Sequence, residues 1–142
     1  MSSSQEIETG LSHLDEVEIA STIKRVVLIT GASTGIGFAT AQLLAQRDVF
    51  VLATVRRETD ASRLRALDLG ICPVLLDVCD SDQVSRVAVA VEHLLHRHER
   101  SRLDALINNA GIALGGPLIE LDDETLQRQL EVNVVAPMRM VR

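Results

Sequence analysis

From Arg25 onward, short apolar runs rich in β-branched residues alternate with longer stretches of helical spacing. Residues 26–30, 49–54, 73–77 and 103–108 have the composition of strands. Helical spacing covers about residues 36–46, 62–69 and 81–96, and Asp122 is suited to cap a final helix. This alternation predicts an α/β fold, a Rossmann-type doubly wound parallel sheet. Right-handed crossovers predict the strand order 3-2-1-4, with the pattern cut short after the fourth strand and fourth helix.

A glycine-rich segment, TGASTGIG, joins the first predicted strand to the first predicted helix. Gly31 permits a tight turn, Gly35 lets the backbone approach a diphosphate, and Gly37 lets the helix pack against the sheet. Free amides at the helix start attract an anion, and the hydroxyls of Ser33 and Thr34 add donors. An isolated motif of this kind is as often a structural turn, but the position between strand and helix predicts a dinucleotide site.

Three further motifs follow in order: Asp77-Val78 after the third strand, NNAG from Asn108 to Gly111, and Asn133 in the last helix. With TGASTGIG, they resemble the short-chain dehydrogenase/reductase family over about residues 24–142, and specifically its N-terminal, cofactor-binding half. The resemblance implies hydride transfer between a nicotinamide cofactor and a small alcohol or carbonyl substrate. It implies that Asn133 is catalytic. The cofactor contacts that it implies are Gly31, Ser33, Thr34, Gly35, Ile36, Gly37, Asp77, Val78, Asn109, Ala110 and Gly111.

The same motif residues also have structural interpretations. Asp77 could cap a turn, and Asn108 and Asn109 could tie loops to the sheet through side-chain hydrogen bonds. For the two asparagines both accounts can hold at once.

The end of the second predicted strand bears on the choice of dinucleotide. An NAD site places an acid about 20 residues after the glycine turn, whereas this chain has Arg56 and Arg57 there. A guanidinium can hold the 2′-phosphate of NADP in a bidentate contact, so we expect NADP(H) to be favoured over NAD(H). The alternative is that both arginines are solvated, with Glu58 or Asp60 turned toward a ribose.

The proton-transfer residues of the resembled family are missing from the sequence. That family uses a tyrosine, with a lysine four residues later, to exchange the substrate proton. This chain contains no tyrosine, and Lys24 is its one lysine and precedes the first strand. We therefore expect no turnover by this chain alone. Pro137 lies four residues after Asn133 and cannot donate to its carbonyl, which predicts a bend in the last helix, either functional or an ordinary proline kink.

Three accounts of the function remain open. The chain is either a shortened portion of an NADP(H)-dependent oxidoreductase, a non-catalytic NADP(H)-binding or regulatory module that pairs with a full-length relative, or a remnant that does not fold. The fourth strand and last helix are predicted to lack cover, so we expect self-association, with a homo-oligomer formed through that helix. The substrate is not specified by any residue present.

Composition narrows the partners and the location. Residues 1–23 carry five acids and no base, which predicts an acidic flexible extension before a domain at 24–142. A net charge of −6 and 1% aromatic residues argue against nucleic acid. No apolar run approaches the roughly 20 residues of a membrane span, and two cysteines favour a reducing cytoplasm. His93, His96 and His98 lie in a charged helix end, so we expect no metal site.

Overall fold

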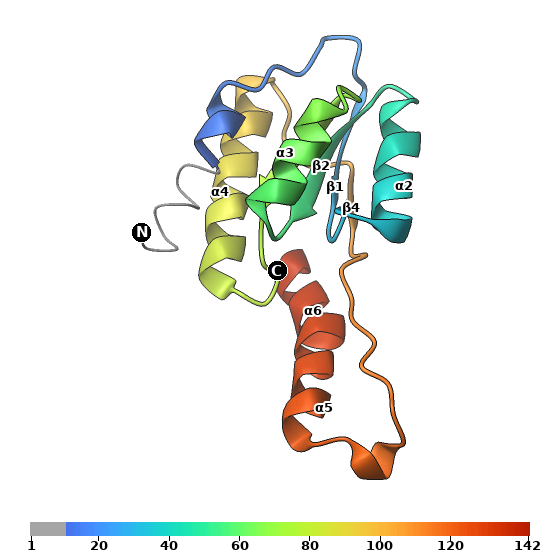
Figure 1. Ribbon diagram of the computed structural model, residues 1–142. Coiled ribbons are helices and arrows are strands. Elements are labelled where there is room, and N and C mark those ends of the chain that lie inside the picture. The colour runs from blue at the N-terminus through green and yellow to red at the C-terminus, as the bar shows by residue number, and fades with distance from the viewer. Residues whose placement is uncertain (1–10) are drawn as a thin grey trace.

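The computed structural model describes residues 11–142, in which a parallel four-stranded sheet lies between two helical layers (Figure 1). The elements, in chain order, are η1 (His13–Asp15), β1 (Arg25–Ile29), α2 (Gly35–Ala45), β2 (Val49–Val55), α3 (Glu58–Ala66), β3 (Ile71–Leu75), α4 (Ser81–Arg97), β4 (Ala105–Ile107), η2 (Leu118–Glu120), α5 (Asp123–Leu130), η3 (Glu131–Val135) and α6 (Ala136–Val141). The short elements η1 and η2 are 3-10 helices, and η3 is a π-helical turn.

The strand order is β3-β2-β1-β4 and every neighbouring pair is parallel, which confirms the topology predicted from the sequence. The register pairs Val27 of β1 with Val51 of β2 on one side and with Ala105 of β4 on the other. The order therefore reverses beside β1. In sheets of this kind, ligands bind outside the carboxyl ends of the strands at that reversal.

Alternate side chains of β1 build the two halves of the core. Val26 and Leu28 pack with the buried face of α4, whereas Val27 and Ile29 pack with α2 and α3 on the opposite face. All four side chains are buried, as expected for a central parallel strand that is covered on both sides.

Two elements begin earlier than the sequence pattern predicts. The third helix, α3, begins at Glu58 rather than at residue 62, because Glu58 and Asp60 suit the positive end of a helix and Glu58 pairs with Arg65 at 2.6 Å. The third strand begins at Ile71 and includes Pro73. Because β3 is an edge strand, the missing amide of the proline is tolerated.

The acidic extension is predicted over residues 1–23, of which residues 1–10 lie outside the described part. Residues 11–23 pack against the α4 side of the sheet, where Leu14 and Ile19 are buried. Arg97 donates to the carbonyl oxygen of Leu14 at 2.6 Å, and the His98 ring lies 3.2 Å from that of Val17. The apolar residues of this stretch thus belong to the same core cluster as the buried face of α4.

The C-terminal helices extend away from the sheet (Figure 1). Asp122 caps α5, as predicted, by accepting from the amide of Thr125 at 2.7 Å. The α-helical geometry is then interrupted at η3, which contains Asn133, and resumes at α6 with Pro137 in its first turn. The irregularity lies where the proline predicts it. Within residues 11–142, no helix is long and apolar enough to cross a bilayer.

Candidate functional site

The glycine-rich loop between β1 and α2 depends on glycine for its backbone and its packing. Gly31 has φ of 66° and Gly35 has φ of 60°, both in the left-handed region that favours glycine. A Cβ atom on Gly31 would lie 2.8 Å from the Cα atom of Ala110, so the close approach of the two loops also requires glycine there. At Gly35 a Cβ atom would meet no atom within 4 Å, which leaves open space beside its backbone.

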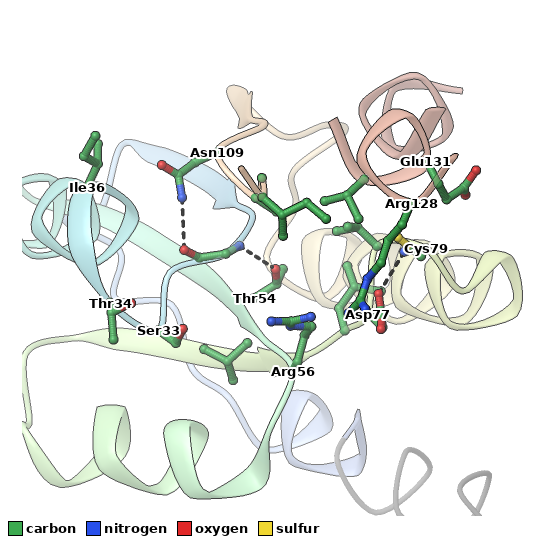
Figure 2. Close-up of a pocket in the computed structure, with 18 residues that line it drawn as sticks. Ser33, Thr34, Ile36, Thr54, Arg56, Asp77, Cys79, Asn109, Arg128 and Glu131 are labelled. Atoms are coloured by element: carbon green, nitrogen blue, oxygen red, sulfur yellow. Dashed lines mark hydrogen bonds between the residues drawn. The ribbon is translucent and has the colours of Figure 1, made fainter. Parts of the chain in front are cut away.

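Side chains of Thr30, Thr54 and Asn109 hold this loop in place, and Figure 2 shows the contacts of Thr54 and Asn109. The Asn109 side-chain amide donates to the carbonyl oxygens of Thr30 and Gly31, both at 3.0 Å. The backbone amides of Asn109 and Ala110 donate to the Thr30 hydroxyl, again at 3.0 Å each. From β2, the Thr54 hydroxyl accepts from the amide of Gly31 at 3.3 Å. The structural interpretation of Asn109 is therefore correct, whatever its contact with a ligand.

The N-terminus of α2 packs closely against the loop and against Asn109. A Cβ atom on Gly37 would lie 2.4 Å from Nδ2 of Asn109 and 2.5 Å from the Gly31 carbonyl oxygen, so the helix can begin here only with glycine. Thr34 occupies the N-cap position but makes no side-chain capping hydrogen bond. The first-turn amides of α2 thus lack the usual capping partner, and the positive end of the helix dipole faces the loop.

A cavity of about 550 Å³ opens beside the loop at the carboxyl edge of the sheet (Figure 2). Its lining comes from the glycine loop, the ends of β2 and β3, the NNAG segment and the last helix. The lining residues are Gly31, Ser33, Thr34, Ile36, Thr54, Val55, Arg56, Leu76, Asp77, Val78, Cys79, Asn109, Ala110, Gly111, Ile112, Arg128, Glu131 and Val132.

The structure brings most of the residues that the sequence suggested as cofactor contacts to this one cavity. Gly35 and Gly37 belong to the loop and helix start without lining it. Arg57 also does not line it, because this residue is the N-cap of α3. Asn133 does not line the cavity, but it hydrogen-bonds the lining residue Ile112.

The two acids near the end of β2 are engaged elsewhere. Glu58 accepts from Arg65 at 2.6 Å and from the Ser62 hydroxyl at 3.1 Å, and the hydrogen bond from Arg65 lowers the pKa of its carboxyl group. Asp60 lies 3.5 Å from the guanidinium of Arg63. Among the four charged residues at positions 56–60, Arg56 alone lines the cavity.

The wall after β3 is a short ordered turn. The carboxylate of Asp77 accepts from the amide of Cys79 at 3.0 Å, and the amide of Asp77 donates to the Gln83 side chain at 2.9 Å. Asp77 therefore does cap a turn, the structural alternative considered from the sequence, while its side chain still lines the cavity.

Sequence reasoning missed three charged residues around the cavity. Arg128 and Glu131 reach it from the last helix, and Arg128 extends toward Asp77 (Figure 2). Arg63, on α3, donates to the carbonyl oxygen of Ser33 in the glycine loop. No local pattern in the sequence marks Arg128, because its reach into the cavity depends on how the whole helix packs.

The Asn133 side chain forms two hydrogen bonds with the backbone of Ile112, which directly follows the NNAG motif. Its side-chain Nδ2 donates to the carbonyl oxygen of Ile112 at 2.8 Å, and its Oδ1 accepts from the amide of Ile112 at 2.9 Å. A Cβ atom on Gly111 would lie 3.3 Å from that Oδ1 atom, so the absence of a side chain at position 111 leaves room for the Asn133 side chain. The asparagine thus fixes the last helix to one side of the cavity.

Comparison with known proteins decides the family. A family model described as short chain dehydrogenase matches residues 25–142. The chain belongs to the short-chain dehydrogenase family. It is 38% identical over 121 residues to a short-chain dehydrogenase of Penicillium crustosum, covering 84% of this chain and 42% of the relative. It is 31% identical over 118 residues to an NADPH-dependent 3-dehydrocapnine reductase of Ornithobacterium rhinotracheale, covering 83% of this chain and 41% of that relative.

A solved structure agrees with this membership. The crystal structure of a short-chain dehydrogenase from Streptomyces avermitilis superposes with a TM-score of 0.73 at 33% identity, over 83% of this chain and 42% of the other. The short-chain dehydrogenase chain described here thus spans about two fifths of the length of these relatives. The family binds a nicotinamide cofactor.

Proposed function

We propose that the cavity binds NADP(H), and that the chain is the cofactor-binding portion of an NADP(H)-dependent oxidoreductase that acts on a small alcohol or carbonyl compound. The observation that carries the proposal is the open space at Gly35, which lies between the cavity-lining residues Thr34 and Ile36 and beside helix amides that the Thr34 side chain does not cap. A diphosphate placed there meets backbone donors and the positive end of α2. The hydroxyls of Ser33 and Thr34 lie on the same cavity wall. When bound, the cofactor supplies or accepts the hydride.

The charges at the end of β2 support NADP(H) over NAD(H). Arg56 lines the cavity, whereas the nearby acids Glu58 and Asp60 are paired with arginines of α3. An acid is needed to accept from a ribose 2′-hydroxyl, and a guanidinium to hold a 2′-phosphate. We assign the phosphate chiefly to Arg56, with Arg57 as a second, more distant charge. The name of the Ornithobacterium rhinotracheale relative, which includes NADPH, agrees with this preference.

The remaining lining residues suit the two ends of a dinucleotide. Asp77 and Val78 form a wall at the end of β3, where we place the adenine ring, and Asn109, Ala110 and Gly111 flank the loop toward β4, where we place the nicotinamide side. Asn133 has no contact with the cavity itself. We propose that the catalytic role of Asn133 is exerted from η3, next to the Ile112 backbone that it holds.

Binding and turnover are expected to separate in this chain. The sequence contains no tyrosine, and Lys24 lies before β1, at the opposite edge of the sheet from the cavity. No tyrosine–lysine pair is present to exchange a proton with an alcohol or carbonyl oxygen. We therefore expect saturable cofactor binding without oxidoreduction.

Titration with NADPH and NADH tests the proposal. We expect NADPH to bind more tightly, and we expect Arg56→Ala together with Arg57→Ala to remove the preference while leaving NADH binding unchanged. Arg47→Ala with Arg102→Ala removes the same charge away from the cavity and serves as the matched control. Tighter binding of NADH, or an unchanged NADPH affinity in the double variant, would contradict the NADP(H) assignment. Failure to bind either dinucleotide would contradict the whole proposal.

A second candidate is a non-catalytic NADP(H)-binding module that pairs with a full-length relative or with itself through the last helix. The apolar side chains of α5 to α6 favour it, because several are well exposed. They are Leu130, Val134, Val135, Met138 and Val141. Sedimentation of the chain alone and with a full-length relative tests this candidate. A monodisperse monomer in both experiments would contradict it.

We propose a cytoplasmic location on the basis of the two cysteines. Cys72 and Cys79 are both free thiols. Free cysteines persist in reducing compartments. Fluorescence of a tagged chain in cells tests the location, and an accumulation outside the cytoplasm would contradict it.

A further inference from the structure

Arg139 connects the last helix to the wall of the cavity that follows β3. From α6, its Nη1 atom donates to the carbonyl oxygens of Val78 at 3.0 Å and of Cys79 at 3.2 Å. Its Nη2 atom donates to Glu131 Oε1 at 2.8 Å. The Arg139 guanidinium therefore bonds two carbonyls that lie about 60 residues earlier in the sequence, and also the Glu131 carboxylate at the start of η3.

The two carbonyls belong to the turn between β3 and α4, where Val78 is buried in the core. Leu76 makes the last sheet-like hydrogen bond of this region, from its amide to the Val55 carbonyl oxygen at 2.9 Å. Beyond it, Asp77 contacts Cys79 and Gln83, and its carbonyl oxygen accepts from the amide of Asp80 at 3.0 Å. Among residues 11–142, Arg139 supplies the side-chain donor to the carbonyls of Val78 and Cys79. Arg139 therefore links the backbone carbonyls of this wall directly to α6.

Glu131 fixes the direction of Arg139. The two side chains are only a quarter to two fifths exposed, so their pairing is less screened than that of a surface ion pair. Glu131 also begins η3, the π-helical turn that contains Asn133. The segment from η3 to α6 therefore hydrogen-bonds two parts of the cavity lining. Arg139 bonds the turn after β3, and Asn133 bonds Ile112.

We propose that Arg139 is a positioning residue that sets the adenine-binding wall, Asp77 to Cys79, at the distance from the glycine loop that the cofactor requires. The proposal rests on the assignment of the cavity to NADP(H). It predicts selectivity within the cofactor. Loss of Arg139 weakens ligands that carry the adenosine group and spares those that carry only the nicotinamide group.

Three probes measure that selectivity by calorimetry or by fluorescence competition: NADPH, adenosine 2′,5′-bisphosphate and reduced nicotinamide mononucleotide. Arg139→Met removes the charge and the donors at similar length. We expect the Kd of NADPH and of the bisphosphate to rise about tenfold, equal to about 1.4 kcal/mol, and that of the mononucleotide to change less than twofold. Arg139→Lys keeps the charge but cannot reach all three acceptors, so we expect about a threefold rise for the adenosine ligands.

The matched control is Arg100→Met. Arg100 also donates to two consecutive backbone carbonyls, those of Ile23 and Lys24, which directly precede the start of β1 and lie outside the cavity lining. We expect no change in any of the three affinities. An unselective loss in Arg139→Met, or an unchanged bisphosphate affinity, would overturn the inference. If Arg139→Met does not fold, the affinities of Arg139→Lys for the same three ligands test the inference by the same criteria.

The outcome also separates this inference from the proposed function. A wild-type chain that binds NADPH, with variants that retain wild-type affinity, overturns the role of Arg139 alone. A wild-type chain that binds neither NADPH nor the bisphosphate overturns the cofactor assignment and, with it, this inference.

Discussion

The side-chain nitrogen of Asn109 lies 2.4 Å from where a Cβ atom would project from Gly37, so the two residues are compatible only while position 37 lacks a side chain. The same nitrogen bonds the carbonyl oxygens of Thr30 and Gly31. The contact therefore ties the start of α2, the glycine loop and the end of β4 into one unit. The shape of the cavity depends on that unit.

Replacement of Gly37 by alanine tests this packing. The added methyl group overlaps Asn109 and the Gly31 carbonyl oxygen, and we expect a loss of about 1–3 kcal/mol in the free energy of unfolding. Urea denaturation measures it. Gly115→Ala is the control, because a Cβ atom there meets nothing within 4 Å. Equal costs for the two variants would contradict the packing argument.

Thr30 offers a second test of the loop. Its side chain is 1% exposed and its hydroxyl accepts from the amides of Asn109 and Ala110. Thr30→Val keeps the shape but leaves two donors unpaired, and we expect a cost of about 2 kcal/mol or more. Thr54→Val removes one acceptor of Gly31 at an equally buried site and should cost less. Thermal or urea unfolding of both variants measures the difference, and the reverse order of stability would count against these roles.

Asp80 gives a pH-dependent prediction. It caps α4 by accepting from the amides of Gln83 and Asp82, and the bond from Gln83 holds the pKa of the carboxyl below its usual 3.8. A lowered folded-state pKa means that the cap stabilises fully above pH 3.8 and is lost as the pH falls below that value. We expect Asp80→Ala to cost about 1 kcal/mol near neutral pH.

Urea unfolding of wild type and Asp80→Ala near neutral pH and at about pH 3 measures this effect. The difference in stability should shrink at the lower pH. Asp82→Ala is the control, since Asp82 contributes to the cap through its backbone amide alone. A difference between wild type and Asp80→Ala that grows with acidity would contradict the assignment.

The two thiols are expected to differ in reactivity. Burial raises the pKa of Cys72 to about 12, and Cys72 is 8% exposed. The Cys79→Ser variant, in which Cys72 is the remaining thiol, should therefore resist thiol reagents at about pH 8 while folded.

Cys79 is half-buried and lines the cavity. Burial, followed by the charge of Asp77, raises the pKa of its thiol. The Cys72→Ser variant should therefore react slowly, and more slowly still with NADPH bound. Labelling followed by mass spectrometry measures both rates; faster reaction at Cys72, or no protection by NADPH, would contradict this picture.

The sheet and the glycine loop could be predicted from the sequence because their signals are local. β-branched runs such as 26–30 and the spacing of Gly31, Gly35 and Gly37 specify a strand, a turn and a helix start within a few residues. The crossover rule then orders the strands. Asp77 and Asn109 follow strands directly, so their place at the carboxyl edge follows from the same reasoning.

The contributions of helix faces and of the N-terminal segment could not be predicted in the same way. Arg63, Arg128 and Arg139 each act at a point set by how a whole helix packs, and a lone charge on a helix usually faces solvent. The docking of Leu14 on the α4 side depends on carbonyl acceptors whose donors, such as Arg97, lie more than 80 residues later. No local pattern carries that information.

The pairing of β1 with β4 determines when the cavity can take shape during folding. The amide of Val26 meets the Asp104 carboxylate across 78 residues of sequence, whereas β1 and β2 are joined by a single helix. Closing the longer loop costs more chain entropy, so we expect β1, α2 and β2 to assemble early and β4 to add late. The half of the cavity near the glycine turn would then exist before the NNAG wall arrives, and a ligand that bridges both would favour the final step.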